Sequence, residues 1–271
     1  MKSDTINLIR HTVVCKNPLI HCITNPISIT ACANAILAVG GRPIMAEHPS
    51  EVEEITTTAH SLMLNLGNIT DARISSMAIS AAAAREENIP FVVDIVGAAC
   101  SRLRRDYALA LIDSSKPALI KGNYAEIYSL ANRDYTSSGV DTDSSIAPSA
   151  MIETAAKLAR QYDCTVLASG KTDVVTDGTK LILSYNGTPQ LACITGTGCM
   201  LGALCTAFLS SADAFFAAAC ACTVLGISGE LACSVKGNGS FAVNLIDALS
   251  TMSDEIIKIN MKLEEHCLEN F

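Results

Sequence analysis

Short apolar runs alternate along the chain with longer stretches in which apolar residues recur at helical spacing. The apolar runs predict β-strands at residues 18–24, 42–47, 61–67, 90–97, 117–123 and 164–170. The stretches between them predict helices at residues 27–40, 49–60, 70–89, 101–113, 123–132 and 149–162, with a polar loop at 133–148. Strands separated by helices of this length are typical of an α/β fold with a mainly parallel sheet.

The last third of the chain departs from this alternation. Residues 173–187 predict a β-hairpin, because the Asp177-Gly178 pair suits a tight turn between strands. Three more helices are expected at 198–211, 213–235 and 241–266. The sequence has no linker-like segment, long charge run or repeat. We therefore expect residues 1–271 to form a single domain, with helices flanking the central sheet.

Charge and composition exclude several classes of partner. The formal net charge is −8, so no basic surface is expected to attract nucleic acid or an anionic membrane. Residues 214–229 are uncharged, but this stretch is shorter than the roughly 20 residues that span a bilayer. We expect a buried helix there, between layers or between subunits. With 49% hydrophobic residues, the chain is also expected to form oligomers.

The chain has twelve cysteines, several of which lie in apolar runs: Cys32, Cys205, Cys220, Cys222 and Cys233. No CxxC pair occurs and no signal peptide is recognisable, so we expect neither a zinc site nor disulfides. Reduced, buried thiols in a cytoplasmic protein are the simplest interpretation.

Polar residues gather where the predicted parallel strands end. Asp94 ends one strand, Lys121 and Asn123 end the next, and Ser169 ends another. Ligands of open parallel sheets bind beyond these carboxyl ends. The coincidence predicts a binding site at this edge of the sheet.

The segment CITGTGCMLG (193–202) comes just before a predicted helix. Gly196 and Gly198 permit close backbone approach, and a helix that begins near Gly198 would direct free N–H groups at an anion. Thr195 and Thr197 add hydroxyl groups. An ordinary capped turn explains the same residues equally well. The segment lacks the lysine of a Walker-type loop, so that motif is excluded.

Cys199 would lie in the first turn of this helix, where the dipole favours a thiolate. It could act as a nucleophile, a redox thiol with Cys193, or a proton acceptor, or it could be an inert buried side chain. No histidine shows a local signature for a base beside it, which counts against a nucleophile.

Lys121, Asp94 and Glu126 form a second candidate group. Lys121 can meet phosphate charge, and Asn123 is expected to cap a helix with Glu126 at its third position, a capping box. The two carboxylates offer oxygen ligands suited to Mg²⁺. Together with the glycine turn they suggest metal-assisted phosphoryl transfer.

Several segments resemble the hydroxyethylthiazole kinases, a family within the ribokinase-like group. These segments are residues 21–54 (HCITNPISITACANAILAVGGRPIMAEHPSEVEE), NLGNI (65–69), the NxxE element from Asn123 to Glu126, and TGTGCMLGAL (195–204). The resemblance covers about residues 15 to 265. It implies a ribokinase-like fold and transfer of the ATP γ-phosphoryl group to the primary alcohol of 4-methyl-5-(2-hydroxyethyl)thiazole, in thiamine salvage.

The resemblance also implies roles for individual residues in a homotrimer that binds thiazole between subunits. Met45, Gly196 and Asn25 would contact the thiazole, Lys121 and Ser169 would contact ATP, and Asp94 and Glu126 would organise Mg²⁺. Gly196, Thr197, Gly198 and Cys199 would form the anion hole. Cys199 would stand where related sugar kinases carry an aspartate base.

The chain departs from the family pattern at DIVGAAC (94–100), where the family typically reads DPVGxGA: Ile95 replaces a proline and Ala99 a glycine. A family GPGSF-like element reads GNGSF (237–241). Two further functions therefore stay open: a related kinase for another small alcohol, such as a hydroxymethylpyrimidine, or a catalytically weakened protein that binds thiazole or nucleotide.

Overall fold

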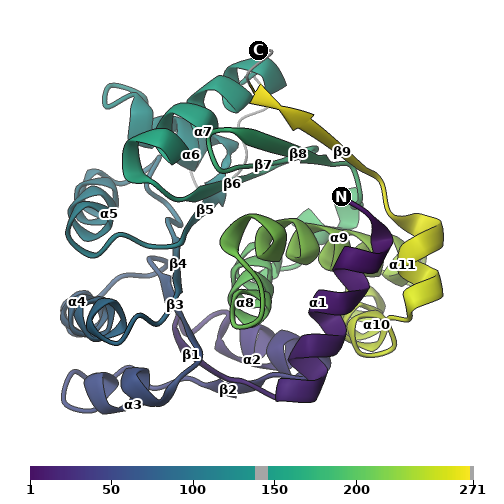
Figure 1. The fold of residues 1–271 in the computed structure, drawn as a ribbon, viewed down its shortest axis with the longest axis horizontal. Helices are drawn as coiled ribbons and strands as arrows, with labels where there is room; N and C mark the ends of the chain where they lie inside the picture. The colour runs from purple at the N-terminus through teal and green to yellow at the C-terminus, as the bar shows by residue number, and fades with distance from the viewer. Residues whose placement is uncertain (138–145, 269–271) are drawn as a thin grey trace.

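Strands and helices alternate through the first two thirds of the chain, as the hydrophobic pattern predicts (Figure 1). The computed structural model describes residues 1–137 and 146–268. The elements are α1 (Ser3–Lys16), β1 (Leu19–Ile23), α2 (Ile29–Ala38), β2 (Arg42–Ile44), α3 (Val52–Thr58), β3 (Ser61–Asn65), α4 (Asp71–Glu86), β4 (Phe91–Asp94), α5 (Arg102–Ser115), β5 (Leu119–Asn123), α6 (Tyr124–Ala131), α7 (Pro148–Tyr162) and β6 (Thr165–Ser169). They continue with β7 (Asp173–Thr176), β8 (Lys180–Ser184), the 3₁₀ helix η1 (Pro189–Cys193), α8 (Thr197–Leu209), α9 (Ala214–Ala232), α10 (Asn238–Ser250), α11 (Asp254–Asn260) and β9 (Leu263–Cys267).

One sheet runs through the molecule in the order β2-β1-β3-β4-β5-β6-β7-β8-β9. Strands β1 to β6 are parallel to one another, whereas β7 is antiparallel to β6, β8 to β7 and β9 to β8. The predicted α/β fold with a mainly parallel sheet is confirmed, and so is the hairpin of β7 and β8.

Helices cover both faces of this sheet (Figure 1). Helices α3 to α7 pack on one face, while α1, α2, α8, α9 and α10 pack on the other. Alternate strand residues supply the two cores. Along β4, Val92 belongs to the α8 side, whereas Phe91 and Val93 belong to the side of α4 and α5. Burial on both faces explains why these strands are continuous apolar runs.

Helices α8 and α9 lie inside the curve of the sheet (Figure 1). Among the described residues, α9 alone is long and apolar enough to cross a bilayer by length and composition. However, 78% of its most apolar window is buried inside the protein. A helix that is apolar on all sides and surrounded by other elements is a core helix, as residues 214–229 predict.

The predicted single helix at 241–266 is wrong. Helix α10 ends at Ser250, and Ser253 begins α11 by accepting a hydrogen bond from the Ile256 N–H. Residues 263–267 then pair with β8 as an antiparallel edge strand. A serine cap followed by two acidic residues starts a new helix, so the periodicity does not continue through it.

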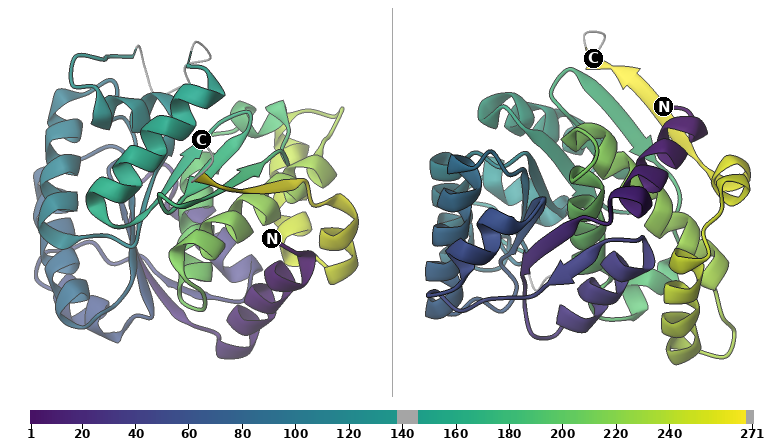
Figure 2. Two further views of the ribbon diagram at one scale, coloured as in Figure 1. Left: turned by 45° about the horizontal axis from the view of Figure 1, so that its top comes forward. Right: turned by 60° about the horizontal axis from the view of Figure 1, so that its bottom comes forward.

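The first and last segments of the chain meet on the α8 side (Figure 2). Arg10 of α1 contacts Asp254 at the start of α11 with Nη1 and Oδ1 3.1 Å apart. Helices α1 and α11 also pack against α9. Neither α1 nor η1 was predicted from the sequence, and Cys193 ends η1 just before the glycine turn.

All twelve cysteines lie in the described part of the chain, and none is disulfide-bonded there. Cys32, Cys205, Cys220 and Cys222 are buried, as predicted, but Cys233 is exposed at the end of α9.

Candidate active site

Three polar side chains form a row across neighbouring strand ends. The register pairs Asn65 of β3 with Asp94 of β4, and Asp94 with Lys121 of β5. Each lies two residues after a strand residue that packs in the core on the α8 side, namely Met63, Val92 and Leu119. Because side chains two residues apart on a strand point to the same face, all three face α8. All three are buried. The sheet register thus brings them to one spot beneath the start of α8.

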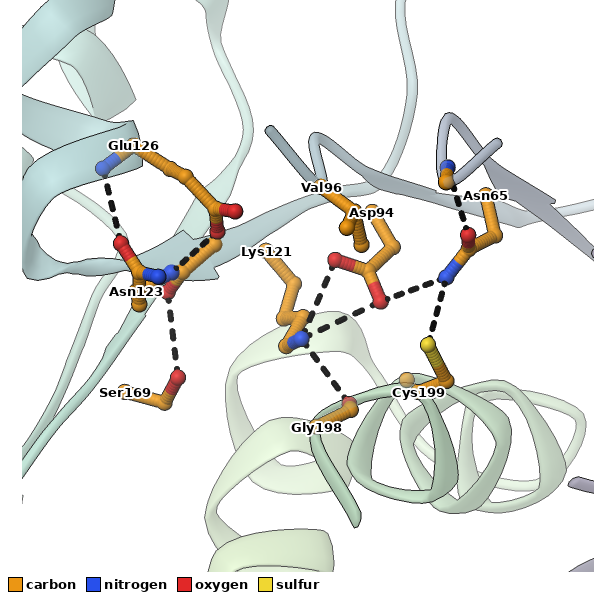
Figure 3. A network of polar contacts seen from close by, with 12 residues as sticks. Asn65, Asp94, Val96, Lys121, Asn123, Glu126, Ser169, Gly198 and Cys199 are labelled. Carbon is orange, nitrogen blue, oxygen red and sulfur yellow. Dashed lines mark hydrogen bonds and ion pairs between the residues drawn. The ribbon is translucent and has the colours of Figure 1, made fainter. Parts of the chain in front are cut away.

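Lys121 is the central cation of this row (Figure 3). Its Nζ lies 3.0 and 3.1 Å from the two carboxylate oxygens of Asp94 and 2.9 Å from the Gly198 carbonyl oxygen. Burial alone would lower the pKa of Lys121, but the charges of Asp94 and Glu126 raise it above its ordinary value. Burial raises the pKa of Asp94, while Lys121 and Asn65 favour its carboxylate. The two side chains have the geometry of a hydrogen-bonded ion pair.

The Cys199 thiol lies on the other side of Asn65 (Figure 3). The Asn65 amide nitrogen is 2.9 Å from Asp94 Oδ2 and 3.4 Å from Cys199 Sγ. The Asn25 amide nitrogen is also 3.4 Å from Cys199 Sγ. The thiol is therefore bonded to the same network as the ion pair.

Glu126 is held by the predicted capping box of α6. Its Oε2 accepts a hydrogen bond from the Asn123 N–H at 2.7 Å, and its Oε1 accepts one from the Gly97 N–H at 2.7 Å. Burial raises the pKa of Glu126 to about 7; the Lys121 charge opposes this rise and the Asp94 charge adds to it. The carboxylate thus connects α6 to the loop after β4.

The glycine turn leads directly into α8. Gly196 has φ 97° and caps the helix, and the Met200 N–H donates the first helical bond to its carbonyl. The backbone N–H groups of residues 197–199 come before Met200 and have no hydrogen-bond acceptor within the helix. The Thr197 hydroxyl donates to the Leu191 carbonyl at 2.8 Å, so Thr197 offers an anion its backbone N–H.

A cavity of about 600 Å³ opens beside this helix start. The exit of β8, η1 and α9 form its walls, and Ser169, Thr197 and Gly198 lie at the sheet end. Ser169 Oγ is 3.3 Å from the Gly122 carbonyl oxygen, on the strand beside it. Burial raises the pKa of Asp173, another lining residue, to about 6. The cavity is large enough for a small organic ligand.

The predicted site residues fall into three groups. Hydrogen bonds join Asn25, Asp94, Lys121, Gly198 and Cys199 into one network, with Glu126 coupled to it by charge. Ser169 and Thr197 line the cavity. Met45 follows edge strand β2 and packs, partly buried, against the core cluster that includes Cys199. Gly196 lies against α2, where an added methyl would be 3.5 Å from Ser28 Cβ.

Asn65 and the cavity walls were not predicted as site residues. Asn65 interrupts an apolar strand just before Gly67, which is the one sequence signal that points to it. The walls come from Asn186, Thr188 and Leu225, whose segments carry no motif.

The described residues contain no group of three or more side chains of the types that usually cage a metal. Asp94 and Glu126 are two buried carboxylates, and Mg²⁺ is commonly held by one or two carboxylates together with waters and phosphate oxygens. The donor set therefore fits Mg²⁺ that arrives with a nucleotide.

The altered loop after β4 keeps its methyl groups inside the protein. Ala98 is 0% and Ala99 2% exposed, and Ile95 packs in the core on the α5 side. The Gly97 amide still donates to Glu126. The Ala99 methyl is therefore buried and adds no exposed group to the site.

Known proteins match nearly the whole chain. The model of the hydroxyethylthiazole kinase family matches residues 11–255. Hydroxyethylthiazole kinase 1 of Clostridium botulinum strain Loch Maree is 43% identical over 265 residues, which cover 95% of this chain and 99% of that protein. These matches run through every element that carries a site residue.

Solved structures agree in fold. A hydroxyethylthiazole kinase protein from Pyrococcus horikoshii superposes with a TM-score of 0.90 at 31% identity, covering 97% of this chain and 99% of that one. A ribokinase-like superfamily protein from Enterococcus faecalis gives a TM-score of 0.63 at 11% identity, covering 92% and 94%, and supports the fold alone. The chain therefore belongs to the hydroxyethylthiazole kinase family.

Proposed function

We propose that this protein transfers the γ-phosphoryl group of ATP to the primary alcohol of 4-methyl-5-(2-hydroxyethyl)thiazole, as a step of thiamine salvage. One observation carries the proposal. The free amides at the start of α8, the Lys121 ammonium and the Cys199 thiol meet at one network, with the 600 Å³ cavity beside it. Family membership supports the choice of alcohol.

ATP would occupy the cavity with its phosphates toward Gly198. Ser169 lines this end, and the amides of residues 197–199 supply N–H donors directed at negative charge. Lys121 already gives its three hydrogens to Asp94 and Gly198, so a contact with phosphate requires one of these bonds to be given up. The helix start and Lys121 would stabilise the charge of the moving phosphoryl group.

The substrate alcohol would lie between Cys199 and the γ-phosphate. Cys199 Sγ accepts hydrogen bonds from Asn25 and Asn65, so it can accept one from the alcohol as well. A loose phosphoryl-transfer transition state asks little of the base. Cys199 therefore acts as a modest proton acceptor and helps to orient the alcohol.

Asp94 and Glu126 would hold Mg²⁺, which neutralises charge on the phosphates when bound. Replacing Glu126 with alanine should therefore raise the magnesium concentration needed for half-maximal activity. A magnesium titration at saturating ATP measures this change. An unchanged titration in folded Glu126→Ala would remove Glu126 from the metal site.

Met45, Asn25 and Gly196 are proposed to contact the thiazole ring, in a homotrimer whose sites lie between subunits. Exposed apolar side chains such as Ile27 and Leu37, on and beside α2, are available for such contacts. A solution mass three times the chain mass of 28.5 kDa would support the trimer. We place the protein in the cytoplasm, where its free cysteines stay reduced, and expect neither nucleic acid nor membrane as a partner.

A kinase for a hydroxymethylpyrimidine is the second candidate, because the same network would serve any small primary alcohol. Incubation with ATP, Mg²⁺ and a panel of alcohols separates the two, with the phosphate ester identified by mass spectrometry. We expect the thiazole ester to form fastest. Preference for the pyrimidine would favour the second candidate, and ATP binding without any ester would indicate a protein that only binds its ligands.

A further inference from the structure

The sulfur of Cys199 receives hydrogen bonds from two side-chain amides, those of Asn25 and Asn65, and Figure 3 shows the bond from Asn65. Asn25 Nδ2 and Asn65 Nδ2 each lie 3.4 Å from Sγ. In the described part of the chain, the sulfur takes part in two hydrogen bonds and is the acceptor in both. The residues come from distant parts of the sequence, the β1–α2 loop and the end of β3, so the fold brings them together.

The orientation of both amides is set by backbone donors. The Gly67 N–H donates to Asn65 Oδ1 at 2.8 Å, which leaves Asn65 Nδ2 facing Asp94 and Cys199. The Ser28 N–H donates to Asn25 Oδ1 at 3.1 Å, which turns Asn25 Nδ2 toward the sulfur and toward Asn65 Oδ1 at 3.3 Å. A backbone N–H is always a donor, so neither amide can be flipped without opposing like groups.

Gly67 permits this arrangement. A methyl group added there would lie 2.7 Å from Asn25 Nδ2 and 2.8 Å from Asn65 Oδ1. Only glycine lets the backbone approach both amides this closely.

We propose that Asn65 is a positioning residue that divides its two amide hydrogens between Asp94 and Cys199 and thereby holds the sulfur as a hydrogen-bond acceptor. The inference rests on the proposed function in one respect, namely that the substrate alcohol is the third donor to the sulfur. Asn65 then acts through Cys199, and it joins the proton acceptor to the Lys121–Asp94 pair.

The first test follows alkylation of Cys199 by iodoacetamide against pH, resolved by peptide mass spectrometry. Exposed Cys193 serves as the internal reference. The thiolate is the form that reacts with iodoacetamide, and a hydrogen bond from Asn65 stabilises it. Removing this hydrogen bond should lower the normalised rate, which is the rate of Cys199 alkylation at pH 7 divided by the plateau rate at high pH. For Asn65→Ala and Asn65→Asp we expect this normalised rate to fall about tenfold, the usual size of one hydrogen bond to a charged group.

Asn68→Asp is the matched control. Asn68 is exposed in the loop that follows β3, and this substitution adds the same negative charge as Asn65→Asp. Its normalised rate should stay within about twofold of wild type. A variant that only changed the access of iodoacetamide to Cys199 would change the plateau rate at high pH and leave the normalised rate unchanged. A normalised rate within twofold of wild type in both folded Asn65 variants would overturn the proposal.

The second test compares the kcat/KM cost of Asn65→Ala in the wild-type protein and in a Cys199→Ala background. If Asn65 acts through Cys199, the loss should be about tenfold in wild type and at least threefold smaller in the second background. Equal losses in the two backgrounds would overturn the proposal. Alkylation needs neither ATP nor alcohol, so failure of the kinase assay alone would refute the proposed function and leave this assignment standing.

Discussion

Each buried ionisable group of the network has a partner that accounts for its charge. Lys121 and Asp94 balance one another, and Glu126 accepts two backbone hydrogen bonds. Breaking one partner of a buried pair costs several kcal/mol, so these side chains hold one geometry. Asp94 and Lys121 were predictable because strand-end polar residues stand out in an apolar pattern, and Glu126 because it completes a capping box with Asn123. The role of Asn65 was not, because its contacts depend on the register of three strands.

Substitutions at Cys199 test the modest role given to its thiol. Cys199→Ala should leave measurable ester formation, because the amides of α8 and Lys121 remain. Cys199→Asp should stay active, because a carboxylate can accept the proton of the alcohol and hydrogen bonds from the same two amides. Steady-state kinetics measure both variants. A folded Cys199→Asp protein with no turnover would contradict the role of proton acceptor.

The raised pKa of Glu126 predicts a pH dependence of stability. With a pKa of about 7, the folded protein retains this proton where the unfolded chain, with a pKa near 4.5, has lost it. Folding stability therefore falls as pH rises from about 4.5 to about 7, by the linkage relation. Urea unfolding of wild type and Glu126→Gln across this range should show a smaller fall in the variant, where the raised pKa of Asp173 still contributes. Parallel stability curves would refute the assignment.

Helix α8 shows how an element can place several groups at once. Its first turn supplies free amides, the carbonyl that binds Lys121, and Cys199, all from residues 197–199. The sequence predicted this helix start within one residue, because glycine and threonine mark it. The break between α10 and α11 and the strand β9 were missed, because β9 is formed by pairing with β8 and carries little pattern of its own.

Gly196→Ala tests the backbone at this helix start. The φ of 97° suits glycine and strains alanine, while the added methyl would meet Ser28 Cβ at an ordinary 3.5 Å. We expect a stability loss of about 1–3 kcal/mol from backbone strain alone. Because the turn must relax, the KM for ATP or the alcohol should rise as well. Unfolding and kinetics together measure this, and wild-type values in both would contradict the account.

At the scale of the whole molecule, the parallel strands bring residues separated by more than a hundred positions to one edge. Asn25, Asp94 and Cys199 meet there because β1, β3 and β4 are neighbours and α8 returns over them. The alternating pattern predicted the sheet and the edge at which its polar residues gather. It did not predict the strand order or the cavity walls, which depend on how distant segments pack.

The most direct test of the account is the initial rate of thiazole ester formation from ATP by wild type, Lys121→Met and Lys157→Met. Lys157 is exposed on α7, away from the network, and controls for the loss of a lysine. We predict that wild type and Lys157→Met form the ester, and that folded Lys121→Met is slower by roughly 100-fold or more, as expected when a group that stabilises transition-state charge is lost. Ester formation by Lys121→Met at the wild-type rate, or none by wild type, would contradict the account.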